Sequence, residues 1–265
     1  MRPTFLELAE NANTYTPLGP GSERVVEPGY VIWFGELDHP SATVVQRLRL
    51  EAGRLEEQIA QIHAAVTARG RRACTWELAG SATPDDLCEQ LLAHGLVLDH
   101  DPYVIGMALT RPPDGPPPVG ITVRKVETLE DRIAATRIAA TAFGDDGAWL
   151  GDRIEQLRAA DTAGRADETS STYLALLDGE PVASGIASFT EAGALLFSGA
   201  SLPEARGRGA YRALVRARWD DAVARGTPAL VTHAGRMSQP ILQRLGFEAI
   251  SEITILLDET VPQAV

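Results

Sequence analysis

Apolar and polar residues follow two different periods along the chain, and these periods predict strands and helices. Alternation with period two predicts strands at residues 30–37, 73–78, 103–109, 121–126, 172–178, 181–189, 194–202, 229–234 and 247–258. Apolar residues three or four apart predict helices at residues 41–69, 84–94, 128–143, 148–160, 209–225 and 239–245. The mixture predicts an α/β (α+β) fold in which mostly antiparallel sheets are flanked by helices.

Turn and cap residues set several of these boundaries. Thr128 followed by Asp131 predicts a capping box at the start of the helix 128–143. Asp178-Gly179 and Gly193 predict tight turns that join the strands between residues 172 and 202 into an antiparallel meander. Gly226 ends the helix 209–225.

A proline-rich segment divides the chain into two halves. Residues 111–120 (RPPDGPPPVG) forbid a helix and favour an extended spacer. Residues 1–110 and 121–265 are therefore predicted to be two domains, joined by this linker. A faint repeat supports diverged copies of one fold, because ACTWELAG followed by LLAHGLVL resembles ALVTHAG followed by LQRLGFEA.

Composition and charge limit the classes of function. Hydrophobic residues make up 45% and charged residues 23% of the 265 residues, as in globular proteins, and no apolar run approaches the length of a membrane span. We therefore expect no membrane association and a cytoplasmic location. The net charge of −12 argues against nucleic acid as a partner and favours a small cationic or amine-bearing substrate. Cys74 and Cys88 lack metal-ligand spacing and are expected to be reduced thiols, so no metal is expected.

A glycine-rich turn precedes the helix 209–225 and is the strongest chemical signal in the sequence. Gly207 and Gly209 would leave backbone N–H groups free at the positive end of the helix dipole, an arrangement that binds phosphate. A mononucleotide P-loop is excluded because the turn contains no lysine, and a dinucleotide fingerprint is excluded because its third glycine position is Arg212.

The turn resembles the pyrophosphate loop of the GCN5-related N-acetyltransferases (GNAT). Arg206-Gly207-Arg208-Gly209-Ala210 follows most of the family pattern [RQ]xxGx[GA], and LQRLGFEAI at 242–250 is similar to the family's closing LGF element. The order of elements across residues 121–258 also resembles the family fold. The resemblance predicts two GNAT-like domains, of which the second carries the loop.

The family resemblance implies an acyl-CoA co-substrate, acetyl-CoA or another acyl-CoA. It implies that the N–H of Leu202 polarises the thioester carbonyl and that glycines let the loop backbone approach the pyrophosphate. Ser238 is expected to touch the cofactor or to cap the short helix that follows. The implied cofactor-binding residues are Leu202, Arg206, Gly207, Arg208, Gly209, Ala210, Tyr211 and Ser238.

The sequence departs from the family at several positions. Tyr211 stands where the family has Gly or Ala, and Leu242 stands where a tyrosine commonly donates a proton to the leaving thiolate. Small residues around 198–201 occupy the strand position that often carries a glutamate base. Acid and base are therefore not assigned by motif.

Attack by an amine on a thioester needs mainly proximity and removal of a proton. Water ordered by polar side chains can take up this proton. The candidates for this role are Ser198, Ser201, Glu191 and His233. His233 is the strongest candidate for a base because histidine titrates near neutrality, with a hydrogen-bonded structural histidine as the alternative. Asp145, Asp146 and Asp152 are candidates for attracting an ammonium group, with a solvated, helix-capping cluster as the alternative.

The first half shows no counterpart of the glycine turn between GELDHPSATVV and its predicted helix, so we expect a degenerate, non-catalytic copy. The leading hypothesis is an acetyl-CoA-dependent N-acetyltransferase that acts on a small primary amine by direct attack in a ternary complex. A non-catalytic acyl-CoA-binding or regulatory protein and a purely structural tandem module are the alternatives. The chain is expected to be a monomer or a homodimer.

Overall fold

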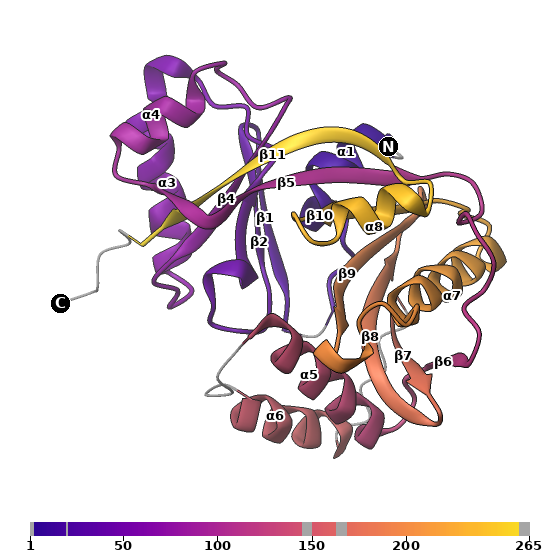
Figure 1. The fold of residues 1–265 in the computed structure, drawn as a ribbon. Helices are drawn as coiled ribbons and strands as arrows, with labels where there is room; N and C mark the ends of the chain where they lie inside the picture. Colours follow the sequence, from indigo (N-terminus) through magenta and orange to yellow (C-terminus); the bar gives the residue numbers. More distant parts are fainter. Residues whose placement is uncertain (1–2, 20, 145–149, 163–168, 260–265) are drawn as a thin grey trace.

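The computed structural model describes residues 3–19, 21–144, 150–162 and 169–259 (Figure 1). Its described strands form one eleven-stranded sheet in the order β1-β2-β3-β4-β11-β5-β10-β9-β8-β7-β6. The strands are β1 (Glu23–Glu27), β2 (Tyr30–Phe34), β3 (Thr43–Gln46), β4 (Cys74–Ala79), β5 (Val97–Leu109), β6 (Ile121–Lys125), β7 (Ser170–Leu177), β8 (Glu180–Phe189), β9 (Ala194–Ser201), β10 (Leu230–Ala234) and β11 (Glu248–Asp258).

Helices lie on both faces of this sheet. The α-helices are α1 (Phe5–Glu10), α2 (Ala12–Tyr15), α3 (Leu55–Thr67), α4 (Leu87–Ala93), α5 (Leu129–Phe143), α6 (Leu150–Thr162), α7 (Ala210–Ala224) and α8 (Gln239–Arg244). Three short 3₁₀ helices are η1 (Pro40–Ala42), η2 (Ala52–Arg54) and η3 (Pro203–Ala205). No described helix is long and apolar enough to cross a membrane.

The two halves repeat one order of elements. Apart from η1, which has no counterpart, the series β1, β2, β3, η2, α3, β4, α4 and β5 in the first half matches β7, β8, β9, η3, α7, β10, α8 and β11 in the second. In both halves the third and fourth strands of the series pair in parallel, β3 with β4 and β9 with β10. This correspondence supports the predicted relation between the halves.

The long last strands of the two series join the halves. β11 of the second half pairs with β4 and β5 of the first, and β5 pairs in turn with β10 of the second half. In Figure 1, β5 and β11 run side by side through the centre of the molecule, with α3 and α4 at one end and α7 at the other. The sheet is therefore continuous across the halves.

Alternate residues of β7 face two different helices. On β7, Tyr173 and Ala175 pack in the cluster that contains Leu214 of α7, whereas Leu174 packs with Ile138 of α5. The segment α1–α2 covers the centre of the sheet through Leu8, Ala9 and Ala12, which pack with Val231, Ala108 and Leu195. The α5 and α7 helices therefore lie on opposite faces.

Most predicted elements are confirmed within a few residues, but the predicted helix at 41–69 is wrong in its first part. Residues 43–46 form β3 and α3 begins only at Leu55, because Val44, Val45 and Leu48 are buried in the sheet region and do not belong to the helix face. Gly53 therefore lies in η2, two residues before the start of α3, so the expectation that no glycine precedes this helix is also wrong. The segment α1–α2 and strand β1 were not predicted.

The linker joins β5 to β6 without a helix or strand over residues 111–120. Asp131 N–H donates to the Thr128 hydroxyl at 3.1 Å, which confirms one arm of the predicted capping box. The Asp131 carboxylate, by contrast, pairs with Arg124 of β6. The division into domains at 111–120 stays a prediction.

Candidate functional site

The glycine turn lies between the end of β9 and the start of α7, as the sequence predicts. Gly207 and Gly209 adopt φ values of 76° and 92°, in the left-handed region that glycine enters without strain. Gly209 is the N-cap of α7 and has no side chain with which to satisfy the first N–H groups of the helix. The turn therefore directs unpaired helix N–H groups toward the surface at the positive end of a 15-residue helix.

Three exposed arginines surround this turn. The side chains of Arg206, Arg208 and Arg212 form no hydrogen bond or ion pair with any residue that the structure describes. Several other arginines pair with carboxylates, as Arg153 pairs with Glu36 at 2.7 Å. In a chain of net charge −12, this cluster is a local positive surface suited to an anion.

The linker contacts the same turn. A Cβ atom placed on Gly209 would lie 2.8 Å from the Cβ of Pro118, so Gly209 lets the linker approach the backbone. Arg216 of α7 donates to the carbonyl oxygens of Pro113 and Asp114 at 3.0 and 3.2 Å. The linker is therefore a strap fixed along the first turns of α7.

Strands β9 and β10 separate beside the turn and form a wedge. They pair through three residues only, ending at Leu196 and Thr232, although β9 continues to Ser201. The Thr232 hydroxyl donates to the Leu196 carbonyl at 3.1 Å and closes the narrow end of the wedge.

A β-bulge interrupts β9 within the wedge. Phe197 pairs with Ile186 and Ala200 with Ser184, so Ser198 and Gly199 together oppose the single residue Gly185. Ser198 has φ 49°, which is unusual for a residue with a side chain. Both bulge residues are exposed.

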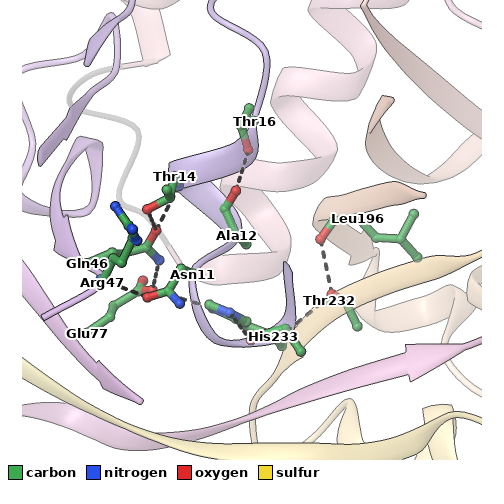
Figure 2. A network of polar contacts seen from close by, with 11 residues as sticks. Asn11, Ala12, Thr14, Thr16, Gln46, Arg47, Glu77, Leu196, Thr232 and His233 are labelled. Atoms are coloured by element: carbon green, nitrogen blue, oxygen red, sulfur yellow. Dashed lines mark hydrogen bonds and ion pairs between the residues drawn. The ribbon is translucent and has the colours of Figure 1, made fainter. Parts of the chain in front are cut away.

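His233 is the first residue of β10 beyond the last β9–β10 pair, and its ring lies beneath the N-terminal segment (Figure 2). Nε2 lies 2.9 Å from the Ala9 carbonyl oxygen, and Nδ1 lies 3.6 Å from Glu77 Oε2 of β4. A carbonyl oxygen only accepts, so Nε2 carries a hydrogen in this contact. The remaining nitrogen faces a carboxylate instead of an open pocket.

Further polar contacts connect this histidine to the first half (Figure 2). Glu77 accepts a hydrogen bond from the Gln46 amide, and Gln46 Oε1 accepts from the Thr14 N–H at 2.9 Å. Asn11 Oδ1 accepts from the Arg47 N–H at 2.7 Å. These contacts support the alternative that His233 is a hydrogen-bonded structural histidine. Its role as a base stays a prediction.

Comparison with known proteins was informative only at the level of structure. No protein-family model matches the chain, and no curated protein matches it. A GCN5-related N-acetyltransferase from Kribbella flavida matches with a TM-score of 0.67 at 19% identity, over 90% of each chain. A GCN5-related N-acetyltransferase from Sphaerobacter thermophilus matches with a TM-score of 0.60 at 18% identity, over 91% of this chain and 83% of that one.

A tandem GNAT protein from the clavulanic acid biosynthesis pathway, solved without acetyl-CoA, matches 98% of this chain and 95% of its own. The TM-score is 0.60 and the identity 16%. The chain has the GNAT fold. The predicted fold class and the predicted resemblance are thereby confirmed, and the tandem arrangement of the two halves is consistent with the third match.

Within this GNAT fold, the structure corrects the prediction for Leu202. Its N–H donates to the Val182 carbonyl at 2.9 Å within the sheet, so it is not free to polarise a thioester. The bulge at Ser198 and Gly199 offers backbone outside regular pairing a few residues earlier on the same strand.

The other predicted catalytic residues do not gather at the wedge. Glu191 lies at the β8–β9 turn, at the opposite end of β9 from the bulge, in a hollow of about 300 Å³ with Tyr15 and Phe189. Ser198 lies four positions after Ala194, or about 13 Å along an extended strand. Ser201 lies beyond the bulge with a buried hydroxyl that has no hydrogen-bond partner among the described residues. Only Ser198 lies at the bulge itself.

The remaining predicted cofactor residues have mixed outcomes. The Ser238 hydroxyl donates to the Gly235 carbonyl at 3.2 Å and makes no cap hydrogen bond to α8. Leu242 is fully buried in the core, so it contributes no polar group to the wedge. Ala210 is buried at the start of α7. Tyr211 packs with its ring against Gly199 of the bulge, and burial raises the pKa of its hydroxyl while the nearby Arg218 opposes that rise.

Asp152 and the two cysteines belong to elements other than the turn and α7. Asp152 is exposed in the first turn of α6, a position that the helix dipole favours, and Asp145 and Asp146 lie outside the described residues. Cys74 and Cys88 belong to β4 and α4 of the first half. Burial raises the pKa of both thiols, most strongly for Cys74, so neither is a nucleophile prepared for catalysis.

Two residues of the site region were missed by the sequence analysis. Glu77 carries no sequence signal that links it to His233, because it lies on the other half. Arg218 could have been found, since it falls between Leu214 and Trp219 on the apolar face of α7 and is 1% exposed. A charged residue in phase with the buried face of a helix is such a signal.

Proposed function

We propose that the protein is an acetyl-CoA-dependent N-acetyltransferase. It transfers an acyl group from a CoA thioester to the primary amine of a small molecule, by direct attack in a ternary complex. The free cysteines further support a cytoplasmic setting. The GNAT fold supports acyl transfer as a class of reaction, and the residues of the second half support the particular assignments.

The glycine turn with its three arginines carries this proposal. In it, the N–H groups at the start of α7 bind the pyrophosphate of CoA, and Arg206, Arg208 and Arg212 add charge-assisted hydrogen bonds. Gly207 keeps the approach open, because no atom lies within 4 Å of the place where its Cβ would be. No other described helix start combines a glycine turn with unpaired arginines.

The wedge supports the placement of the thioester. The pantetheine arm enters between β9 and β10 where they separate, and a backbone N–H of the bulge at Ser198 or Gly199 polarises the carbonyl oxygen, in place of Leu202. The amine then attacks the carbonyl carbon, the carbon–sulfur bond breaks, and the proton lost by the amine reaches the thiolate through water. Neither described cysteine lies in the second half, which favours direct transfer over an acyl-enzyme.

The acceptor is a small primary amine in this proposal. The negative net charge of the chain favours an ammonium-bearing substrate over an anionic one. The N-terminal segment, held by His233 and Glu77, forms one wall on the face of the sheet opposite α7. This wall limits the space for a large acceptor.

A non-catalytic acyl-CoA-binding or regulatory protein is the second candidate. It is favoured by the engaged nitrogens of His233 and by the burial of Leu242, which together leave no assigned acid or base. Such a protein would bind acyl-CoA at the same site as the proposed acetyltransferase but would not transfer the acyl group.

The test is calorimetric titration of acetyl-CoA, followed by release of free CoA with a panel of primary amines. The first variant is Arg208→Glu, which reverses one exposed charge; Gly209→Glu is less suitable because its side chain would meet Pro118. Arg72→Glu reverses an exposed charge in the first half and is the matched control. We expect one-to-one binding by the wild type and by the control, much weaker binding by Arg208→Glu, and CoA release with at least one amine.

Each outcome separates the alternatives. Binding without CoA release for any amine supports the non-catalytic candidate. Absence of binding by the wild type rejects both candidates and leaves a structural module.

A further inference from the structure

Arg218 is a buried cation that the proposed chemistry has not yet used. It lies on α7 two turns after the glycine turn and is 1% exposed. Nε donates to the Leu214 carbonyl at 3.1 Å and Nη1 to the Ile186 carbonyl at 3.3 Å, while Nη2 has no hydrogen-bond partner. No carboxylate in the described part of the chain forms an ion pair with it.

The acidic residue three positions after Arg218 on the helix is already engaged. Asp221 accepts from the Tyr173 hydroxyl at 2.5 Å and pairs with Lys125 at 2.8 Å. A buried guanidinium is stable only when backbone carbonyls or acids compensate it, and an apolar side chain of similar volume would fit here without that cost in free energy. The charge therefore calls for an explanation other than packing.

Its position relative to the bulge supplies one. Gly185 opposes the bulge, and a Cβ atom there would lie 2.9 Å from Arg218 Nη1. A Cβ atom on Gly199 would lie 2.7 Å from the Tyr211 ring. Helix α7 thus places the Arg218 guanidinium against Gly185, opposite the bulge, and the Tyr211 ring against Gly199 within it. A side chain at either glycine would prevent this contact.

We propose that Arg218 is a positioning residue that acts on the thioester carbonyl through the β9 bulge. This inference rests on the proposed function, because the carbonyl must lie at the bulge. When the amine attacks, the carbonyl π electrons move to oxygen, and they return as the carbon–sulfur bond breaks and the thiolate takes the proton that the amine loses. Arg218 does not touch the substrate. Its buried charge stabilises the negative oxygen, and its bond to the Ile186 carbonyl fixes β8 next to the bulge, opposite the β9 backbone that binds this oxygen.

The test measures the carbonyl directly and needs no amine. Acetyl-CoA labelled with ¹³C at the carbonyl is bound to the wild type, Arg218→Met, Arg218→Lys and Arg225→Met, and the carbonyl stretch is recorded by difference infrared spectroscopy. Arg225 lies at the other end of α7 over the Phe189 ring and is the matched control. We expect a lowered stretch in the wild type, in the lysine variant and in the control, and loss of most of that lowering in Arg218→Met.

Binding, rate and stability give independent readouts. We expect the dissociation constant of acetyl-CoA to stay within about threefold in Arg218→Met, because the loop contacts are unchanged. With an accepted amine, kcat should fall roughly tenfold without a change in KM for acetyl-CoA. The unfolding midpoint should stay equal or rise, because an unpaired buried charge has been replaced by an apolar side chain.

Several outcomes overturn the inference. Full lowering of the carbonyl stretch in Arg218→Met, with normal binding, overturns this inference alone. If Arg218→Met lowers the unfolding midpoint and loses the lowering of the carbonyl stretch, and Arg218→Lys does not restore that lowering, the role of Arg218 is purely structural. If Arg218→Met does not fold, Arg218→Gln replaces it in the infrared measurement, because glutamine can form hydrogen bonds but carries no charge. Failure of the wild type to bind acetyl-CoA overturns the proposed function as well.

Discussion

The turn before α3 and the turn before α7 occupy the same place in the two halves, but they differ in charge. Gly53 and Arg54 precede α3 as Gly207, Arg208 and Gly209 precede α7, and each turn follows a 3₁₀ helix or lies within one. The first turn of α3, however, carries Glu56 and Glu57. The first turn of α7 contains no acidic residue.

The arginines of the two turns differ in their partners. Arg54 donates to both carboxylate oxygens of Glu57 at 3.0 Å and lies 3.6 Å from Glu51, so its charge is neutralised. A hollow of about 390 Å³ lies beside this turn, lined by the start of α3 and by Gln90 and His94 of α4. The first half therefore keeps the place of the turn before its helix, but it lacks both the left-handed glycines and the unpaired positive charge.

This difference shows which residues carry the fold and which carry the chemistry. The apolar residues of both halves build the same strands and helices, and they do so with nearly unrelated sequences. Under the proposed function, a few polar side chains at one helix start decide whether phosphate is attracted or repelled. The fold alone therefore does not decide which half binds a ligand.

Charge reversal at the two turns is the sharpest test of this comparison and has the largest expected effect. Arg206→Glu with Arg208→Glu should weaken acetyl-CoA binding on the order of 100-fold, through loss of two charge-assisted hydrogen bonds. Arg54→Glu should leave affinity within about twofold, with a stoichiometry of one. Isothermal titration measures both quantities, and a second binding site in the wild type that Arg54→Glu abolishes would refute the assignment of one site per chain.

The linker offers a second way to sharpen the comparison, because it straps only the turn of the second half. Arg216→Ala removes the hydrogen bonds to Pro113 and Asp114 and frees the strap beside Gly209. We expect acetyl-CoA to bind about fivefold more weakly, the equivalent of about one net hydrogen bond. Arg225→Ala, at the far end of the same helix, is the control. Equal affinity in both variants would show that the strap does not support the turn.

Local patterns in the sequence were sufficient for most of the fold. Leu214, Val215, Trp219 and Ala222 recur at helical spacing, and all four are buried on one face of α7. Strand β3 was missed because Val44, Val45 and Leu48 also fit a helical spacing, and a strand of four residues is too short to show a period of its own. That error concealed Gly53 and with it the counterpart of the glycine turn.

Contacts between distant segments were not predictable from the sequence. The contact of His233 with Ala9 spans 224 positions, and the insertion of β11 between β4 and β5 leaves no local signal. The glycine turn was found because its residues are consecutive. The Leu202 prediction failed because the pairing of its N–H depends on Val182, on another strand.

The smallest expected effect concerns stability and compares one ion pair from each half. Asp131 of α5 is held by Arg124 of β6, with one contact at 2.6 Å, and its side chain is 8% exposed. Glu23 of β1 pairs with Arg69, with one contact at 3.0 Å, and its side chain is 55% exposed. The hydrogen bond from each arginine lowers the pKa of its carboxyl partner. The more buried pair should contribute more to stability.

We expect Asp131→Asn to lower the free energy of unfolding by roughly 1 kcal/mol at pH 7, and Glu23→Gln by a few tenths of that, measured by urea unfolding. Each folded-state pKa lies below the unfolded value, so the contribution is complete above that value and is lost as the pH falls through the folded-state pKa. The gap between wild type and Asp131→Asn should therefore narrow below about pH 4. A gap that stayed constant down to pH 3 would mean that the asparagine disturbs packing and that the charge of Asp131 contributes nothing to joining β6 to α5.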